Sequence, residues 1–127
     1  MSQPHEVIVP ADISPYPHAF EVSAALILAS YFKQDVIFVS RSTLTSPDVK
    51  IGNIFWEIKS PTGGGKRNIQ HQFNRAMKQS TSIVFDARRS KIDIRKIRKE
   101  LIRQTALTKG LKRLVLITKD KQIEIIK

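Results

Sequence analysis

A chain of 127 residues has the length of one domain and can bury roughly two-thirds of its unfolded surface. Its 22 Lys and Arg against 11 Asp and Glu leave a net charge of +11, which favours nucleic acid, an anionic membrane surface or an acidic protein as partner. The absence of cysteine excludes disulfides, thiolate metal sites and cysteine nucleophiles. Neither a signal peptide nor a membrane-spanning apolar run is visible, so we expect a cytoplasmic site of action and no membrane partner.

Apolar periodicity and turn residues divide the chain into helices and strands. Helices are predicted where apolar residues recur every three or four positions, and strands where short β-branched or aromatic runs lie between turn signals. In chain order we predict an N-terminal arm at 1–16, a helix at 17–32, a strand at 36–39, a hairpin of strands at 48–51 and 54–59, a helix at 68–79, a strand at 82–85, a helix at 93–108, and strands at 113–117 and 122–126. No repeat or linker interrupts this pattern, so the sequence predicts one α/β domain over 17–127, with a mixed central sheet flanked by helices.

The predicted hairpin carries the residues with the clearest chemical meaning. Alternate residues of a strand point to the same face, so Glu57 and Lys59 should lie side by side, with Trp56 and Ile58 on the opposite face. Asp48 begins the neighbouring strand, from which its carboxylate can meet that of Glu57. Hydrolysis of a phosphodiester bond needs such groups, because it requires ligands for a hard cation and positive charge beside the phosphate. The alternative is an ordinary cross-strand ion pair of the kind that sheets often carry.

The same segment offers a metal site. Asp48 and Glu57, with the backbone carbonyl of Ile58, supply oxygen ligands suited to Mg²⁺, with Mn²⁺ or Zn²⁺ as alternatives. Lys59 lies one pleat further along the strand, where its ammonium can orient water and stabilise the transition state. The sequence leaves open whether Lys59 acts as a base or as a fixed positive charge.

Two polar residues on predicted helices are expected to point toward the same site. Glu21 shares a helix face with Ala24 and Leu28, where a carboxylate needs a metal or a basic partner. The alternative is that Glu21 only interacts with the helix dipole, as first-turn carboxylates do. Gln72 is in register with Ala76 and is expected to point inward, the alternative being an ordinary solvated helix residue.

Two basic segments are predicted to contact nucleic acid. The glycine-rich loop before the second predicted helix does not match a phosphate-binding Walker motif, because Arg67 follows Lys66 where Ser or Thr is required. We expect it to be a basic flap beside the active site. The second segment surrounds the third predicted helix, and its alternative interpretation is a solvated face. The predicted nucleic-acid contacts are Lys66, Arg67, Arg88, Arg89, Lys96 and Lys99.

At these residues the chain resembles the PD-(D/E)XK nuclease superfamily, whose signature matches Pro47-Asp48 followed by Glu57-Ile58-Lys59. More narrowly, residues 17–90 are similar to the C-terminal tRNA-nuclease domains of contact-dependent inhibition toxins. The matching residues are Ser46-Pro47-Asp48, Trp56-Glu57-Ile58-Lys59-Ser60, Ile69, Gln72, Ala76, Gln79-Ser80 and Asp86. The resemblance implies a restriction-endonuclease-like αβββαβ core, a catalytic Asp, Glu and Lys at these positions, an assisting glutamate on the first helix, and a cognate immunity protein that blocks the site.

The sequence therefore predicts a metal-dependent endonuclease that hydrolyses phosphodiester bonds, with tRNA or another RNA as the favoured substrate of a toxin-like enzyme. An acidic immunity protein is the partner that the resemblance implies. The first alternative is a DNA endonuclease of the mobile-element or Holliday-junction-resolvase type, which would favour a homodimer. The second is a nucleic-acid-binding module without catalysis, held to its ligand by the basic face alone.

Overall fold

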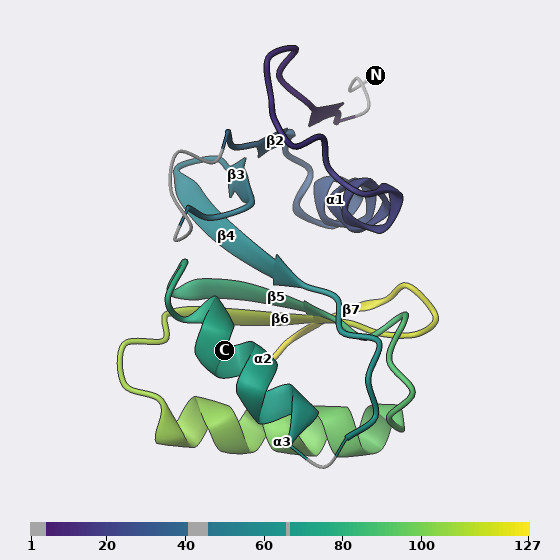
Figure 1. Cartoon of the computed structure of the whole chain (residues 1–127), viewed down its shortest axis with the longest axis vertical. Coiled ribbons are helices and arrows are strands. Elements are labelled where there is room, and N and C mark those ends of the chain that lie inside the picture. The colour runs from purple at the N-terminus through teal and green to yellow at the C-terminus, as the bar shows by residue number, and fades with distance from the viewer. Residues whose placement is uncertain (1–4, 41–45, 66) are drawn as a thin grey trace.

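The computed structural model describes residues 5–40, 46–65 and 67–127, and Figure 1 shows their arrangement. The helices of this part are α1 (Ala19–Phe32), α2 (Asn68–Ala76) and α3 (Ile94–Leu107). The strands are β1 (Val7–Ile8), β2 (Val36–Phe38), β3 (Val49–Ile51), β4 (Ile54–Lys59), β5 (Ser82–Asp86), β6 (Arg113–Ile117) and β7 (Ile123–Ile125). None of the helices in the described ranges has the length and apolar character needed to cross a membrane.

The seven strands form one sheet whose spatial order follows the chain order. Strands β2, β3 and β4 are an antiparallel meander, whereas β4, β5 and β6 are parallel and are connected through α2 and α3. Strand β7 returns antiparallel to β6, and β1 is parallel to β2. The sheet is therefore mixed and flanked by helices, which confirms the predicted α/β class.

Each face of the sheet has its own apolar core. Helix α1 packs on one face through Ala24, Ala25 and Leu28, together with Trp56 and Ile58 of β4 and Val84 of β5. Helices α2 and α3 cover the other face, against Ile83 and Phe85 of β5 and Leu114 and Leu116 of β6. In Figure 1, α2 and α3 lie together beside β5 and β6, away from α1. Every residue of β5 is buried because both of its faces are covered.

The order of elements from α1 to β5 is α-β-β-β-α-β, as the sequence predicted. The arm contains a strand, β1, that the sequence did not predict. It could not be recognised because it has only two residues and shows no period of its own. It forms by pairing with β2 (Val7 with Val36) and is held further by the Val36 N–H, which donates to Glu6 O at 2.9 Å. The first helix begins at Ala19, since Pro17 precedes its N-cap, and the second ends at Ala76, so that Gln79 lies in the turn that follows.

Candidate active site

The β3–β4 hairpin brings two carboxyl groups together inside the protein. Val49 pairs with Trp56, and extending this register by one residue places Asp48 opposite Glu57. The Asp48 N–H donates to Trp56 O at 3.1 Å, and Asp48 Oδ2 accepts from the Ile58 N–H at 2.8 Å. The exposed fractions of Asp48 and Glu57 are 4% and 1%. Backbone pairing and burial thus fix the acidic pair that the sequence predicted at this position.

The two oxygens of Glu57 have different surroundings. Lys59 Nζ lies 3.2 Å from Glu57 Oε2, and in the amide orientation that satisfies both of its ends, Gln79 also donates to Oε2 at 2.7 Å. Glu57 Oε1 is buried, and no hydrogen-bond donor among the described residues reaches it. One oxygen is therefore held in place by two donors, and the other is available to a proton or a cation.

The environment of Glu57 opposes its negative charge. Burial, followed by the hydrogen bond and the charge of Asp48, raises the pKa of the Glu57 carboxyl from 4.5 to about 8, and Lys59 only partly offsets this rise. Two adjacent buried carboxylates repel each other unless a positive charge lies between them. At neutral pH the pair therefore favours binding either a proton or a metal cation.

This pKa predicts how the stability of the metal-free protein varies with pH. The folded state keeps a proton on Glu57 that the unfolded state releases above pH 4.5, so this contribution to stability is complete below 4.5 and is lost as the pH rises through about 8. The Glu57→Gln variant lacks the titration. We expect its unfolding temperature in EDTA to exceed that of the wild type by several degrees at pH 8.5, and the difference to shrink toward pH 5. A constant difference across this range would contradict the assignment.

The donor set of the pair can be compared with the needs of metal ions. The described residues contain no group of three or more His, Cys, Asp or Glu side chains that would hold a metal. Mg²⁺ usually binds one or two protein carboxylates and keeps several of its waters, so Asp48 and Glu57, with the Ile58 carbonyl, fit it. Mn²⁺ also accepts oxygen ligands, whereas Zn²⁺ prefers nitrogen and sulfur. The residues present therefore favour Mg²⁺ or Mn²⁺.

Residues predicted from three separate elements line one cavity, which is linked to the carboxyl pair through Ile58, although neither Asp48 nor Glu57 lines it. This cavity, of about 390 Å³, is bordered by Glu21 of α1, Ile58 of β4 and Gln72 of α2. Glu21 also borders a smaller cavity of about 100 Å³ together with Asp48. Its Oε1 accepts the His18 N–H at 3.0 Å, so Glu21 caps the helix as well as lining the site. The fold therefore brings Glu21 and Gln72 to one cavity despite their distance in sequence, and it brings Glu21 close to Asp48 as well.

Arg88 has a different place from the one predicted. Its guanidinium pairs with the fully buried Asp86, with Nη2 2.8 Å from Oδ2 and Nε 2.9 Å from Oδ1. The remaining donors reach into α1, to Ser23 Oγ at 2.7 Å and Phe20 O at 3.2 Å. The sequence-based interpretation of Arg88 as a nucleic-acid contact is therefore replaced by that of an anchor, which ties α1 to the end of β5.

The other predicted basic contacts lie in different places. Arg89 is exposed at the edge of the 390 Å³ cavity, with its guanidinium 3.7 Å from the centre of the Phe20 ring. Arg67 and Lys96 line a separate groove between α2 and α3. Lys99 is exposed on α3 without lining either space, and Lys66 lies outside the described residues.

Two further residues near the hairpin, Trp56 and Gln79, have well-defined partners. Trp56 is 3% exposed and its ring centroid lies 5.8 Å from that of Phe32, so it is a core residue on the face opposite Glu57. Gln79 was missed as a partner of Glu57, although its alignment with Gln72 on a helix pattern was visible. That signal was incomplete because α2 ends at Ala76, and only the following turn brings Gln79 to β4.

These features define a single mixed α/β domain with a buried carboxylate pair and a lysine on its central hairpin. The family model of the contact-dependent growth inhibition CdiA C-terminal domain matches residues 45–123, so the chain belongs to this family. Among solved structures, it is similar to a chain of the CdiA-CT/CdiI toxin and immunity complex from Burkholderia pseudomallei, with a TM-score of 0.63 and 21% identity over 96% of this chain and 98% of that chain. At this identity the likeness shows a shared fold. No curated protein sequence matches the chain.

Proposed function

We propose that this domain is the toxin of a contact-dependent inhibition system and acts as a metal-dependent endonuclease of the PD-(D/E)XK type. The observation that carries the proposal is the arrangement around Glu57. Lys59 and Gln79 hold its Oε2, while its buried Oε1 has no donor among the described residues and Asp48 adjoins it. Such a pair is costly to bury for structure alone and suits cation binding.

Each residue of the pair and its neighbours has a proposed role. When bound, Mg²⁺ supplies positive charge that neutralises the scissile phosphate, and Asp48, Glu57 and the Ile58 carbonyl would hold it. Lys59 extends from the buried pair toward solvent, with 18% of its side chain exposed, so its ammonium can orient water and stabilise charge on the phosphate. In hydrolysis, water attacks phosphorus, the bond to the leaving oxygen breaks, and a proton from water ends on that oxygen.

The neighbouring cavity supports substrate binding beside this site. Glu21 and Gln72 line it as proposed positioning residues, and Arg89 supplies a cation that the Phe20 ring holds in place. Asn68 also lines the cavity, and its buried Oδ1 has no donor among the described residues. Polar groups that converge on a cavity next to paired carboxylates are typical of an active site.

RNA, and tRNA in particular, is the substrate we propose. Support comes from the net charge of +11 and from membership of the CdiA C-terminal domain family. A cytoplasmic site of action follows from this substrate. DNA cleavage is the alternative, and it would favour a homodimer. Direct comparison of RNA and DNA substrates decides between the two. A module that only binds has no use for the buried pair of Asp48 and Glu57.

An immunity protein is the proposed partner. The similar solved chain from Burkholderia pseudomallei belongs to a complex of toxin and immunity proteins. A cognate inhibitor of this domain would be acidic, because it has to approach a surface with a net charge of +11.

The proposal is tested by comparing substrates and metals with and without Lys59. Purified protein is incubated with total tRNA and with plasmid, linear and branched DNA, each in Mg²⁺, Mn²⁺, Zn²⁺ or EDTA. We expect cleavage of tRNA in Mg²⁺ or Mn²⁺ and none in EDTA. The Lys59→Ala variant should cut at least about a hundredfold more slowly and keep its tRNA affinity within about twofold, because Lys59 acts on the transition state.

Several results would contradict this proposal. A Lys59→Ala protein that cuts tRNA at the wild-type rate would reject the proposed mechanism. Cleavage of DNA alone would favour the resolvase-like alternative. If no metal supports cleavage while salt-sensitive binding of nucleic acid persists, the domain is a binding module.

A further inference from the structure

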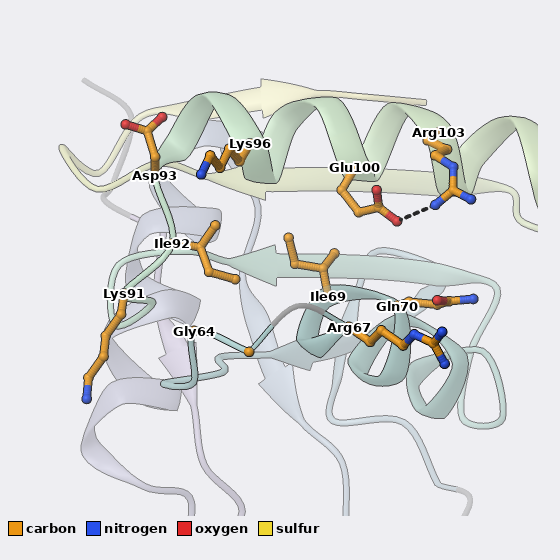
Figure 2. Close-up of a pocket in the computed structure, with 11 residues that line it drawn as sticks. Gly64, Arg67, Ile69, Gln70, Lys91, Ile92, Asp93, Lys96, Glu100 and Arg103 are labelled. Atoms are coloured by element: carbon orange, nitrogen blue, oxygen red, sulfur yellow. Dashed lines mark hydrogen bonds and ion pairs between the residues drawn. The ribbon is translucent and has the colours of Figure 1, made fainter.

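An open groove of about 810 Å³ lies between α2 and α3, apart from the carboxyl pair (Figure 2). Figure 2 shows Lys96 and Arg103 on the α3 wall and Arg67 on the opposite wall, at the start of α2. Lys91 comes from the loop that precedes α3. Basic residues from both helices and from the loop therefore line the groove, with the Lys91 side chain at its end pointing outward in Figure 2.

The two acids that line the groove are already paired with neighbouring residues. Asp93 Oδ1 accepts from the Arg95 N–H at 2.8 Å and lies 3.3 Å from Arg95 Nε, so Asp93 is the N-cap of α3 and forms an ion pair with Arg95. Glu100 Oε1 lies 3.0 Å from Arg103 Nη1 and accepts from Gln104 Nε2 at 2.9 Å. Neither carboxylate is left over to neutralise the remaining cations.

Among the described residues, three cations of the groove have no acidic partner. Within the described ranges, none of Arg67, Lys91 and Lys96 takes part in an ion pair. The apolar side chains that line the groove in the described part of the chain are those of Ile69, which is mostly buried, and Ile92. The centres of protein interfaces are apolar and poor in lysine, whereas phosphate backbones are bound by lysine and arginine on polar walls. The groove therefore fits nucleic acid better than a protein segment.

The groove is continuous with the candidate active site along the chain. Gly63 lines the 390 Å³ cavity with Ile58, and the next residues, Gly64 and Gly65, line the groove. Helix α2 also borders both spaces, because Gln72 lines the cavity and other α2 residues line the groove. A polyanion that lies in the cavity can thus extend past the start of α2 into the groove.

We propose that the α2–α3 groove binds the phosphodiester backbone of a folded RNA at a distance from the bond that is cut. This inference rests on the proposed function and specifies how its substrate is held. Lys91, Lys96 and Arg67 contact phosphates, which orient the RNA without reading its bases. Recognition through this groove depends on the shape of the RNA and not on its sequence.

Binding is measured in the Glu57→Gln background, where substrate is not consumed. Labelled total tRNA is titrated by fluorescence anisotropy at several KCl concentrations, with and without Lys91→Ala plus Lys96→Ala. We expect the double variant to bind about tenfold more weakly at physiological salt. The plot of log affinity against log salt should also become shallower, its slope losing about 1 to 2 in magnitude. The matched control is Lys109→Ala plus Lys112→Ala, which removes the same charge from exposed positions outside the groove and should change affinity less than about twofold.

Lys96→Glu is the second test, since it reverses a charge on one wall of the groove and should weaken tRNA binding more than removal of the same charge does. Thermal unfolding verifies that each variant is folded. If the groove variants bind tRNA with the affinity and salt slope of their parent, the inference is overturned. The same holds if they bind tRNA normally but lose affinity for polyglutamate, which would assign the groove to an acidic protein. Salt-sensitive binding through the groove, in a protein that cuts nothing in any metal, would support the inference and reject the proposed nuclease.

Discussion

Glutamine in place of Glu57 is expected to slow cleavage by about a thousandfold or more while the domain stays folded. The amide has the shape of the carboxyl group it replaces. Its oxygen can accept from Lys59 and Gln79, as Glu57 Oε2 does, and its NH₂ group can donate to Asp48. The hydrogen bonds are kept, but one of the two carboxylates that would hold the divalent cation is lost.

The measurement is a single-turnover rate on tRNA at saturating protein, together with the unfolding temperature in EDTA. Glu6→Gln is a matched control, since it makes the same chemical change on the exposed arm, and it should cut at the wild-type rate. We also expect Mg²⁺ to raise the unfolding temperature of the wild type and not that of Glu57→Gln. A Glu57→Gln protein that cuts normally would exclude Glu57 as a metal ligand.

Removal of the Arg88 guanidinium is expected to destabilise the fold by about 3 kcal/mol, because a buried acid is left without its partner. Asp86 is fully buried, and after Arg88→Ala the donors left to it among the described residues would be the backbone N–H of residue 88 at 3.1 Å and Ser60 Oγ at 3.3 Å. The two contacts of Arg88 to α1 are lost as well. Since α1 carries Glu21, we also expect activity to fall under conditions where the variant is still folded.

Chemical denaturation measures this effect, with Arg89→Ala as the control. Arg89 is exposed, so its removal should change the free energy of unfolding by less than about 1 kcal/mol. The double variant Asp86→Asn plus Arg88→Met should recover part of the loss, because it leaves no buried charge unpaired. If Arg88→Ala is as stable as the wild type and only binds tRNA more weakly, Arg88 is the nucleic-acid contact that the sequence suggested.

The sequence by itself determined the features that depend on local geometry. The period of a strand places Glu57 and Lys59 on one face, opposite Trp56, and the Gly52-Asn53 turn pairs that strand with the one that begins beside Asp48. Helical periodicity located all three helices of the described chain to within a few residues. These rules are local because they depend on neighbours along the chain, so an acidic pair across a tight hairpin was predictable.

Only the tertiary structure decided contacts between distant elements. Strand β1 exists because β2 offers it a hydrogen-bonding edge, and Gln79 reaches Glu57 because α2 ends early. Charge counts also could not separate a partly buried anchor such as Arg88 from an exposed neighbour such as Arg89, since both are arginines of one basic run. Burial and pairing depend on what packs against a side chain, and residues remote in sequence supply that environment.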